Sequence, residues 1–215
     1  MNSLNEYTKN LRHDFEKSDF NEKDAKADPF RQFEKWLDEA VKSGVHEPNA
    51  MVLSTCTKKG KPSSRIVLLR GLKDHGFNFF TNYGSRKGKE LKDNPYASLL
   101  FYWPDLERQV RIEGKVTFAP AKISDEYFNS RPRISRLGAW ASPQSKVLKG
   151  RKELESLVSK FGEKFSEEIP RPEHWGGYIL KASYYEFWQG RHSRLHDRIV
   201  YSMKNGIWKK DRLAP

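Results

Sequence analysis

Apolar residues along this chain follow two different spacings, one typical of helices and one typical of strands. The helical spacing comes first, in a stripe made of Phe30, Phe33, Trp36, Leu37, Ala40 and Val41. Asp28 and Pro29 fit the N-cap and first turn of a helix, and Gly44 fits its end. The pattern therefore predicts a helix between Asp28 and Gly44 that packs its stripe into a core.

From residue 51 to about 118 the pattern becomes typical of strands. Segments 51–56 and 64–69 flank the turn-forming sequence Lys-Lys-Gly-Lys-Pro, which predicts a β-hairpin. Further strands are expected at 77–81, 97–103, 109–118, 177–182, 185–188, 198–203 and 207–210, and further helices at about 86–92, 122–129, 134–140 and 150–165. Asn205-Gly206 joins the last two strands and is a strong hairpin signal.

Regular helices do not separate these strands, which argues against a doubly wound parallel sheet. The order of elements instead predicts a mainly β protein with peripheral helices, an α+β fold built around a small β-barrel. We expect a flexible, charged N-terminal arm over residues 1–28, followed by a single domain over residues 29–215.

The charge of the chain favours anionic partners. Its 215 residues carry a net charge of +12, which suits nucleic acid, a membrane surface or phosphorylated metabolites without choosing among them. The only cysteine, Cys56, lies in an apolar run, which excludes an intramolecular disulfide and fits a core position. The sequence shows no zinc-ligand spacing, signal sequence or membrane span, so we expect a soluble, cytoplasmic protein without a bound metal.

Four short segments combine cations with aromatic or polar residues: 65–70, 85–87, 127–135 and 186–198. The last of these holds three arginines and two histidines beside Phe187-Trp188. Guanidinium groups grip phosphate and aromatic faces cover planar rings, so the four clusters together favour a ligand, or a pair of ligands, with more than one phosphate. For any one cluster, a basic surface loop or a capped surface helix is the alternative.

Individual residues within or near these clusters suggest specific tasks. Arg86 and Lys87 begin a helix that Ser85 caps, where free N–H groups and cations together suit phosphate. Gln109 offers an amide that can bind the edge of a heteroaromatic ring, with a solvated strand start as the alternative. His196 lies two residues from both Arg194 and Arg198, which should disfavour its protonated form.

Arg65 and Arg70 are five residues apart, so in a continuous strand they would point to opposite faces unless the strand bulges or ends between them.

The sequence contains no nucleophile elbow, paired-carboxylate constellation or glycine-rich nucleotide loop. Redox chemistry on a bound cofactor is therefore more plausible than hydrolysis by side chains.

Eight short motifs follow one another along the chain: Arg65-Ile-Val-Leu-Leu69, Phe80-Thr-Asn82, Gly84-Ser-Arg-Lys87, Leu106-Glu-Arg-Gln109, Ser130-Arg-Pro-Arg133, Trp175-Gly-Gly177, Phe187-Trp-Gln-Gly190 and Arg194-Leu-His-Asp-Arg198. In the order and spacing of these motifs, the chain closely resembles the pyridoxamine 5′-phosphate oxidases, flavoenzymes of vitamin B6 metabolism. The resemblance implies an FMN-binding split β-barrel that works as a homodimer, with each FMN between the subunits.

The implied reaction is the oxidation of pyridoxamine 5′-phosphate or pyridoxine 5′-phosphate to pyridoxal 5′-phosphate. Dioxygen would accept the electrons and give hydrogen peroxide, and the amine substrate would also release ammonia. By motif, the residues implied to bind FMN are Arg65, Ile66, Val67, Leu68, Leu69, Arg70, Phe80, Thr81, Arg86, Lys87, Gln109, Gln144, Ser145, Trp188 and Arg198.

The substrate would meet a second, overlapping set of residues. These are Arg70, Tyr127, Arg131, Ser135, Arg194, Leu195 and His196, together with Arg12, His13, Asp14 and Phe15 of the arm. Of these, Arg194 and His196 are implied to act at the reacting end of the substrate. Position 70 is Arg here, whereas the family commonly has Lys. A planar guanidinium with several N–H donors therefore replaces a compact ammonium group, and the charge is kept while the geometry changes.

Three other functions compete with this interpretation. The first is a relative on the same barrel that binds FMN but acts on another substrate, and the second is a pyridoxal phosphate carrier without turnover. The third is a nucleic-acid-binding barrel that uses basic residues and aromatic platforms. The spacing of the four clusters favours the oxidase, and we expect neither nucleic acid nor membrane as a partner.

Overall fold

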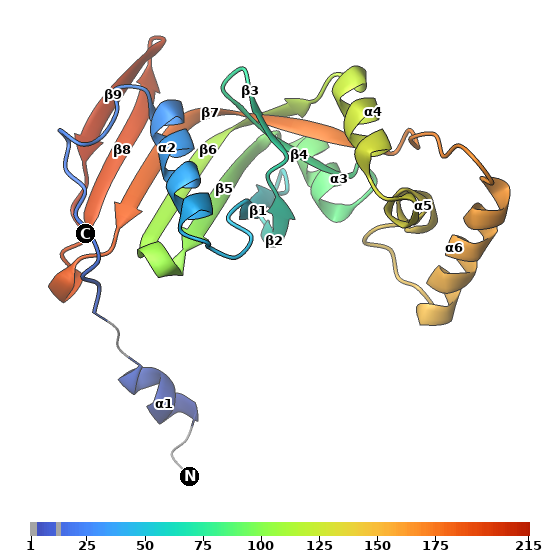
Figure 1. The fold of residues 1–215 in the computed structure, drawn as a ribbon, viewed down its shortest axis with the longest axis horizontal. Coiled ribbons are helices and arrows are strands. Elements are labelled where there is room, and N and C mark those ends of the chain that lie inside the picture. The colour runs from blue at the N-terminus through green and yellow to red at the C-terminus, as the bar shows by residue number, and fades with distance from the viewer. Residues whose placement is uncertain (1–3, 12–13) are drawn as a thin grey trace. The chain divides into compact units, whose positions relative to one another are not determined.

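The computed structural model of the protein describes residues 4–11 and 14–215. Its strands are β1 (Ala50–Cys56), β2 (Pro62–Leu68), β3 (Gly71–Lys73), β4 (Gly76–Asn82), β5 (Tyr96–Trp103), β6 (Arg108–Phe118), β7 (Trp175–Gln189), β8 (Asp197–Lys204) and β9 (Ile207–Arg212). The helices are α1 (Leu4–Asn10), α2 (Pro29–Lys42), α3 (Arg86–Asp93), α4 (Ala121–Ser130), α5 (Arg133–Ala141) and α6 (Arg151–Lys164) (Figure 1). The prediction of a mainly β protein with peripheral helices is confirmed.

The strands hydrogen-bond in the order β2-β1-β5-β6-β7-β4-β3, and β8 pairs with both β7 and β9. The chain forms two compact units. Unit 1 comprises the residues up to Pro48 together with 100–112 and 184–215, and unit 2 comprises 49–99 and 113–183. Strands β5, β6 and β7 each contribute residues to both units.

Helix α2 of unit 1 forms where the sequence predicts it. The side chain of Asp28 accepts a hydrogen bond from the Phe30 N–H at 2.8 Å, and Gly44 takes the left-handed conformation, φ +72°, that ends the helix. Val41 is wrongly predicted as a core residue, since 58% of it is exposed. The buried stripe is therefore narrower than the apolar spacing suggests.

Aromatic side chains dominate the core of unit 1. Trp36 of α2 packs against Phe20 at a ring distance of 4.8 Å and against Phe187 of β7 at 5.3 Å. Phe20 belongs to the predicted arm but is buried, and its N–H donates to Asp197 of β8. The hairpin of β8 and β9 turns at Asn205-Gly206, where both residues have positive φ, as predicted for this pair.

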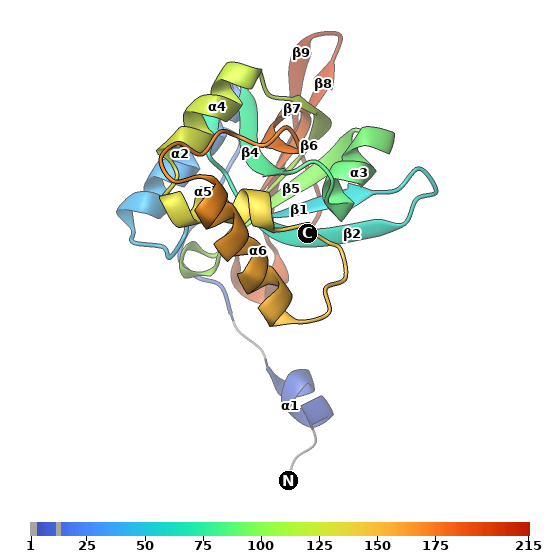
Figure 2. The ribbon, with the colours of Figure 1, turned by 90° about the vertical axis from the view of Figure 1, so that its right-hand side faces the viewer.

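Unit 2 is built on two hairpins and four helices. Strands β1 and β2 pair in register from Ala50 opposite Leu68 to Cys56 opposite Pro62, and Figure 2 shows them side by side. Strand β4 pairs with β3 on one side and with the first part of β7 on the other. Helices α5 and α6 pack against each other.

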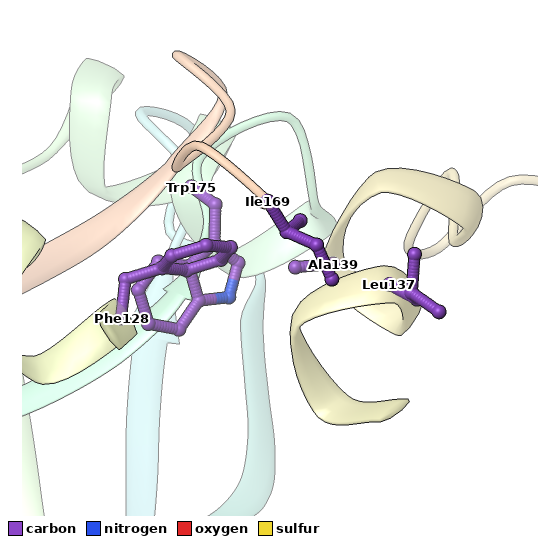
Figure 3. Close-up of a cluster of buried hydrophobic side chains, with 5 residues drawn as sticks. All are labelled: Phe128, Leu137, Ala139, Ile169 and Trp175. Carbon is purple, nitrogen blue, oxygen red and sulfur yellow. The ribbon is translucent and has the colours of Figure 1, made fainter. Parts of the chain in front are cut away.

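A small apolar core in unit 2 joins helices α4 and α5 to β7. It contains Phe128, Leu137, Ala139, Ile169 and Trp175. Figure 3 shows Trp175 against Phe128, with the ring centroids 5.2 Å apart. This packing fixes α4, and therefore also the residues that follow its end, relative to the start of β7.

The structure corrects one strand prediction. Segments 177–182 and 185–188 belong to a single strand, β7, which is fifteen residues long. Ser183 and Tyr184 look like a polar break in the sequence, but they keep an extended backbone because β4 and β8 pair with successive parts of the strand. The short strand β3 is an addition that the apolar pattern does not signal.

Candidate functional site

A cavity of about 300 Å³ in unit 2 brings together residues from five of the predicted motifs. Its lining is Arg65, Ile66, Val67, Leu68, Arg70, Phe80, Thr81, Lys87, Tyr127, Arg131, Gln144 and Trp175. All of these except Trp175 are residues predicted to bind FMN or substrate. Four are cations and none is acidic, so the cavity suits an anionic ligand.

The end of β2 explains why Arg65 and Arg70 line the same cavity. The strand ends at Leu68, and the Arg70 N–H leaves the β1–β2 ladder to donate to Asn78 O of β4 at 2.8 Å. The alternation of sides that holds within a strand therefore no longer applies at Arg70. Leu69, between them, is buried and is not among the residues that line the cavity.

Three oxygen atoms accept hydrogen bonds from the guanidinium of Arg65. Its Nη1 donates to Leu53 O at 3.0 Å and to Thr55 Oγ1 at 2.6 Å, and its Nη2 donates to Ser63 Oγ. Burial lowers the pKa of this guanidinium, and the nearby Glu90 carboxylate partly offsets that effect. These hydrogen bonds set the direction of the Arg65 guanidinium.

Lys87 is a neighbouring cation, placed by the first turn of α3. Ser85 caps this helix, as predicted, by accepting a hydrogen bond from the Gly88 N–H. Lys87 Nζ donates to Gln144 Oε1 at 3.0 Å and to Thr81 Oγ1 at 3.2 Å. Burial lowers the pKa of Lys87, and repulsion from Arg65 lowers it further. Two like charges held close together form a site that a phosphate would stabilise.

Arg70 and Arg131 form another pair of like charges, among aromatic rings. The Arg131 guanidinium lies 4.7 Å from the centre of the Trp175 ring, and the Arg70 guanidinium lies 5.8 Å from that of Tyr127. Burial lowers the pKa of Arg131, and repulsion from Arg70 lowers it further. The electrostatic interaction with Tyr127 raises this pKa and so offsets part of the decrease. Arg131 Nη1 is buried and finds no hydrogen-bond partner among the described residues.

The aromatic residues beside these arginines form a stack. Tyr127 and Phe80 are stacked with ring centroids 4.0 Å apart, and Phe80 stacks on Trp175 at 5.7 Å. Trp175 lies in one of the family motifs, but sequence reasoning gave it no role in the site. The sequence feature that could have indicated Trp175 is the pair of glycines that follows it. Glycines leave space for neighbouring aromatic rings, as Gly177 does for the ring of Phe80.

Other predicted residues of unit 2 do not reach this cavity. Arg86 and Ser145 line a neighbouring cavity of about 440 Å³, and Arg86 Nε donates to Glu90 at 2.8 Å. Ser135 is half-buried on α5 and is not among the lining residues. Arg133 belongs to the same motif as Arg131 but donates to the carbonyls of Phe165 and Glu167, near the end of α6.

Apart from the arm, the remaining predicted residues belong to unit 1: Gln109, Trp188, Arg194, Leu195, His196 and Arg198. The His196 ring lies 4.6 Å from that of Trp188, and its Nδ1 accepts a hydrogen bond from the Arg191 N–H at 3.1 Å. Its neutral form therefore carries the proton on Nε2. The pKa of His196 is lowered, as predicted, but burial is the largest cause, followed by repulsion from Arg194.

Arg198 was predicted to act with Arg194 on the pKa of His196, but burial, Arg194 and Asp197 are the causes of the shift, and Arg198 is engaged by an acid instead. Its Nε donates to the buried Glu186 at 2.7 Å, and Glu186 also pairs with Arg111. Asp197 accepts from Arg212 at 2.6 Å and pairs with Arg191. Arg194 is exposed and has no acidic partner in the described part of the chain, and Asp197, the acid nearest to it in sequence, is engaged by Arg191 and Arg212 instead.

Two of the four predicted arm residues can be placed. Phe15 packs edge-on against both Trp188 and His196, with ring distances of 5.6 Å in each case. A Cβ at Gly190 would meet Phe15 at 2.7 Å, so this glycine makes room for the ring. Asp14 Oδ2 lies 4.0 Å from His192 Nε2. Arg12 and His13 lie outside the described residues.

Comparison with known proteins gives the family. A model of pyridoxamine 5′-phosphate oxidase matches residues 37–164, and a model of the pyridoxine 5′-phosphate oxidase C-terminal dimerisation region matches residues 175–215. The chain belongs to the pyridoxamine 5′-phosphate oxidase family. The resemblance predicted from the motifs is confirmed.

Relatives and solved structures agree with this family. The pyridoxine/pyridoxamine 5′-phosphate oxidase of Actinobacillus succinogenes is 53% identical over 205 residues, covering 95% of this chain and 98% of the relative. That of Neisseria gonorrhoeae is 51% identical over 206 residues, with 96% and 98% covered. The crystal structure of PhzG from Burkholderia lata 383, in complex with tetrahydrophenazine-1-carboxylic acid, superposes with a TM-score of 0.87 at 31% identity, covering 93% of this chain and 99% of PhzG.

A related FMN-binding protein from Nostoc punctiforme superposes with a TM-score of 0.69 at 18% identity, covering 88% of this chain and 100% of that protein, a likeness of fold alone. The predicted split-barrel fold is confirmed by these matches.

In the described residues no group of three or more histidine, cysteine or acidic side chains is arranged to hold a metal. Nor does any helix there have the length and apolar character to cross a membrane.

Proposed function

We propose that the protein is an FMN-dependent oxidase that converts pyridoxamine 5′-phosphate or pyridoxine 5′-phosphate to pyridoxal 5′-phosphate in vitamin B6 salvage. Relatives named for these substrates are about half identical over nearly the whole chain. The observation within the structure that carries the proposal is Arg131. Its guanidinium lies over Trp175 with one nitrogen that is buried and has no partner in the described parts of the chain, which suits a ligand with both a phosphate and an aromatic ring.

The residues of the cavity fit FMN together with a phosphorylated substrate. Two separate pairs of cations, Arg65 with Lys87 and Arg70 with Arg131, provide for two phosphates. We assign the first pair to the phosphate of FMN and the second to that of the substrate. The backbone and side chains of Ile66, Val67 and Leu68 would then border the flavin.

Bound FMN would supply the redox chemistry, as the acceptor of a hydride equivalent from the exocyclic carbon of the substrate, with dioxygen as the final electron acceptor that is reduced to hydrogen peroxide. The task of the protein is to hold the substrate ring in the geometry for this transfer. Arg131 and Arg70 hold the phosphate end. Neutral His196 keeps its Nε2–H free to donate, because its Nδ1 is taken by the Arg191 N–H. Arg194, which has no acidic partner among the described residues, adds a cation for the substrate.

We further propose that the protein is a homodimer with each FMN between the subunits. The match to a dimerisation region covers residues 175–215, and this region also contains Trp188, Arg194, His196 and Arg198. Residues that serve both dimerisation and the flavin site would place the flavin at the subunit boundary. Ile66 and Leu195 are exposed apolar members of the predicted site, consistent with a surface that a partner covers.

The test of this function is the flavin content and activity of the purified protein. We expect about one FMN per subunit and formation of pyridoxal 5′-phosphate from both phosphorylated substrates, with much weaker activity on unphosphorylated pyridoxine. Tetrahydrophenazine-1-carboxylic acid, the compound bound in the PhzG structure, serves as the competing substrate. Oxidation of that compound in preference to the B6 phosphates would contradict the proposal.

A further inference from the structure

Glu90 has a buried carboxylate close to the cavity. The proposed chemistry does not use this carboxylate directly. Glu90 lies on α3 with only 5% of its side chain exposed. Its oxygens accept hydrogen bonds from Ser63 Oγ at 2.6 Å, from Thr55 Oγ1, and from Arg86 Nε at 2.8 Å. Burying a carboxylate is costly unless such donors compensate, so its place calls for an explanation.

The two hydroxyls that donate to Glu90 also accept from Arg65. Arg65 Nη1 donates to Thr55 Oγ1 and Nη2 donates to Ser63 Oγ, while the closest approach of Arg65 to the carboxylate is 3.6 Å. A hydroxyl has one proton, and an ionised carboxylate can only accept. Both hydroxyl protons must therefore point at Glu90, which turns the oxygen lone pairs towards Arg65.

We propose that Glu90 is a positioning residue for the phosphate of FMN, acting through Thr55 and Ser63 to fix how Arg65 presents its guanidinium to the cavity. The inference rests on the proposed function, because it assigns Arg65 to that phosphate. Glu90 does not line the cavity itself, so its charge does not contact the bound anion.

The carboxylate is suited to this role because it stays ionised. Burial alone would raise the pKa of Glu90, but the hydrogen bonds from Ser63, Thr55 and Arg86 outweigh burial and lower it to about 2. The direction of both hydroxyls is therefore constant across the pH range in which enzymes are assayed. Both hydroxyls donate to the same carboxylate oxygen, Oε2, and Arg86 donates to the other, Oε1. A glutamine that turned its NH₂ towards the hydroxyls would reverse both of their hydrogen bonds, and one that turned its NH₂ towards Arg86 would offer the hydroxyls a neutral acceptor in place of a charged one.

The experiment compares two flavins that differ only in the phosphate. Apoprotein is titrated with FMN and with riboflavin, and binding is followed by quenching of flavin fluorescence. For Glu90→Gln we expect FMN affinity to fall by about ten- to a hundredfold, as for the loss of a charge-assisted hydrogen bond, with riboflavin affinity unchanged. In an Arg65→Ala background, the same substitution should have no further effect on FMN.

The matched control is Glu155→Gln on α6. Glu155 accepts from Arg151 Nε at 2.9 Å with the same i,i+4 spacing as the pair of Arg86 and Glu90, but it does not line the cavity. This variant should bind FMN like wild type. If Glu90→Gln does not fold, Ser63→Ala carries the same prediction, since it keeps the carboxylate and removes one bridging hydroxyl.

Two outcomes would overturn the inference. One is unchanged FMN affinity in the Glu90 or Ser63 variant, and the other is an equal loss of FMN and riboflavin, which would indicate general damage rather than a defect at the phosphate. Failure of wild-type apoprotein to bind FMN would instead contradict the proposed function.

Discussion

At the scale of single residues, the arginines of the site differ in what already binds them. Arg133 is engaged by two backbone carbonyls and Arg198 by Glu186, whereas Arg131 has a buried nitrogen that none of the described residues pairs with. Arg131 and Arg133 occupy one short motif, yet only Arg131 can give its full hydrogen-bonding capacity to a ligand. This difference supports the assignment of the substrate phosphate to Arg131.

Arg194 and His196 should act on turnover rather than on flavin binding. We expect Arg194→Ala and His196→Ala to slow reduction of the flavin by saturating pyridoxine 5′-phosphate, because lost positioning acts on a geometry required in the transition state. Rapid-mixing absorbance under anaerobic conditions measures this rate, and the FMN content should stay near that of wild type. Wild-type rates in both variants would exclude these side chains from the reacting end.

The sequence identifies the chemical type of each site residue better than its partners. Predicting Arg65, Lys87, Arg131 and Gln144 required only their motifs, and the cavity brings them together. The link from Arg65 to Glu90 could not be predicted, because it passes through hydroxyls on β1 and β2 that reach α3 only in the folded protein. Arg86 illustrates the opposite case, since its motif implied the flavin site while its side chain lines a neighbouring cavity.

At the scale of elements, most helices and strands follow from local signals in the sequence. Two helices begin, as predicted, at their N-cap residues Asp28 and Ser85. The last hairpin turns, as predicted, at Asn205-Gly206. The length of β7 is set instead by pairing with β4 and β8, a tertiary effect that a local pattern does not contain.

Close contact between β6 and β7 gives a prediction for Gly114. A Cβ at this position would overlap the carbonyl of Lys181, which is backbone and cannot move aside easily. We expect Gly114→Ala to lower the free energy of unfolding by about 2 kcal/mol or more, and thus the melting temperature by about 4–8 °C. Gly138→Ala is the control, because a Cβ added there on α5 would have nothing within 4 Å, and it should stabilise by about 0.5–1 kcal/mol. Equal effects of the two substitutions in thermal unfolding would refute this account of the strand contact.

The bond network of Glu90 should make α3 and the β1–β2 hairpin sensitive to acid. The pKa of Glu90 is lowered from 4.5 to about 2 in the folded protein, so its stabilising effect is complete above pH 4.5 and is lost as the pH falls towards 2. We expect Glu90→Gln to be less stable than wild type in urea at pH 6, with the difference shrinking at pH 3. A difference that does not change with pH would contradict the linkage.

At the scale of the whole molecule, the proposal requires two copies of the chain. If FMN lies between subunits, flavin binding and dimerisation must reinforce each other. We expect sedimentation across a dilution series to show dimers that dissociate at a lower concentration when loaded with FMN than when depleted of it. A monomer that retains full flavin and full activity at assay concentration would be incompatible with a shared site.

The central claim is that this chain oxidises a B6 vitamer through FMN while arginine holds the vitamer's phosphate. The most direct measurement is anaerobic mixing of the FMN-loaded protein with pyridoxine 5′-phosphate or with pyridoxine, following loss of the flavin absorbance. We predict rapid bleaching by the phosphorylated form at low concentration, and for Arg131→Ala a requirement for much higher concentrations with flavin content unchanged. No bleaching by pyridoxine 5′-phosphate, or the same concentration dependence for both compounds, would contradict the claim.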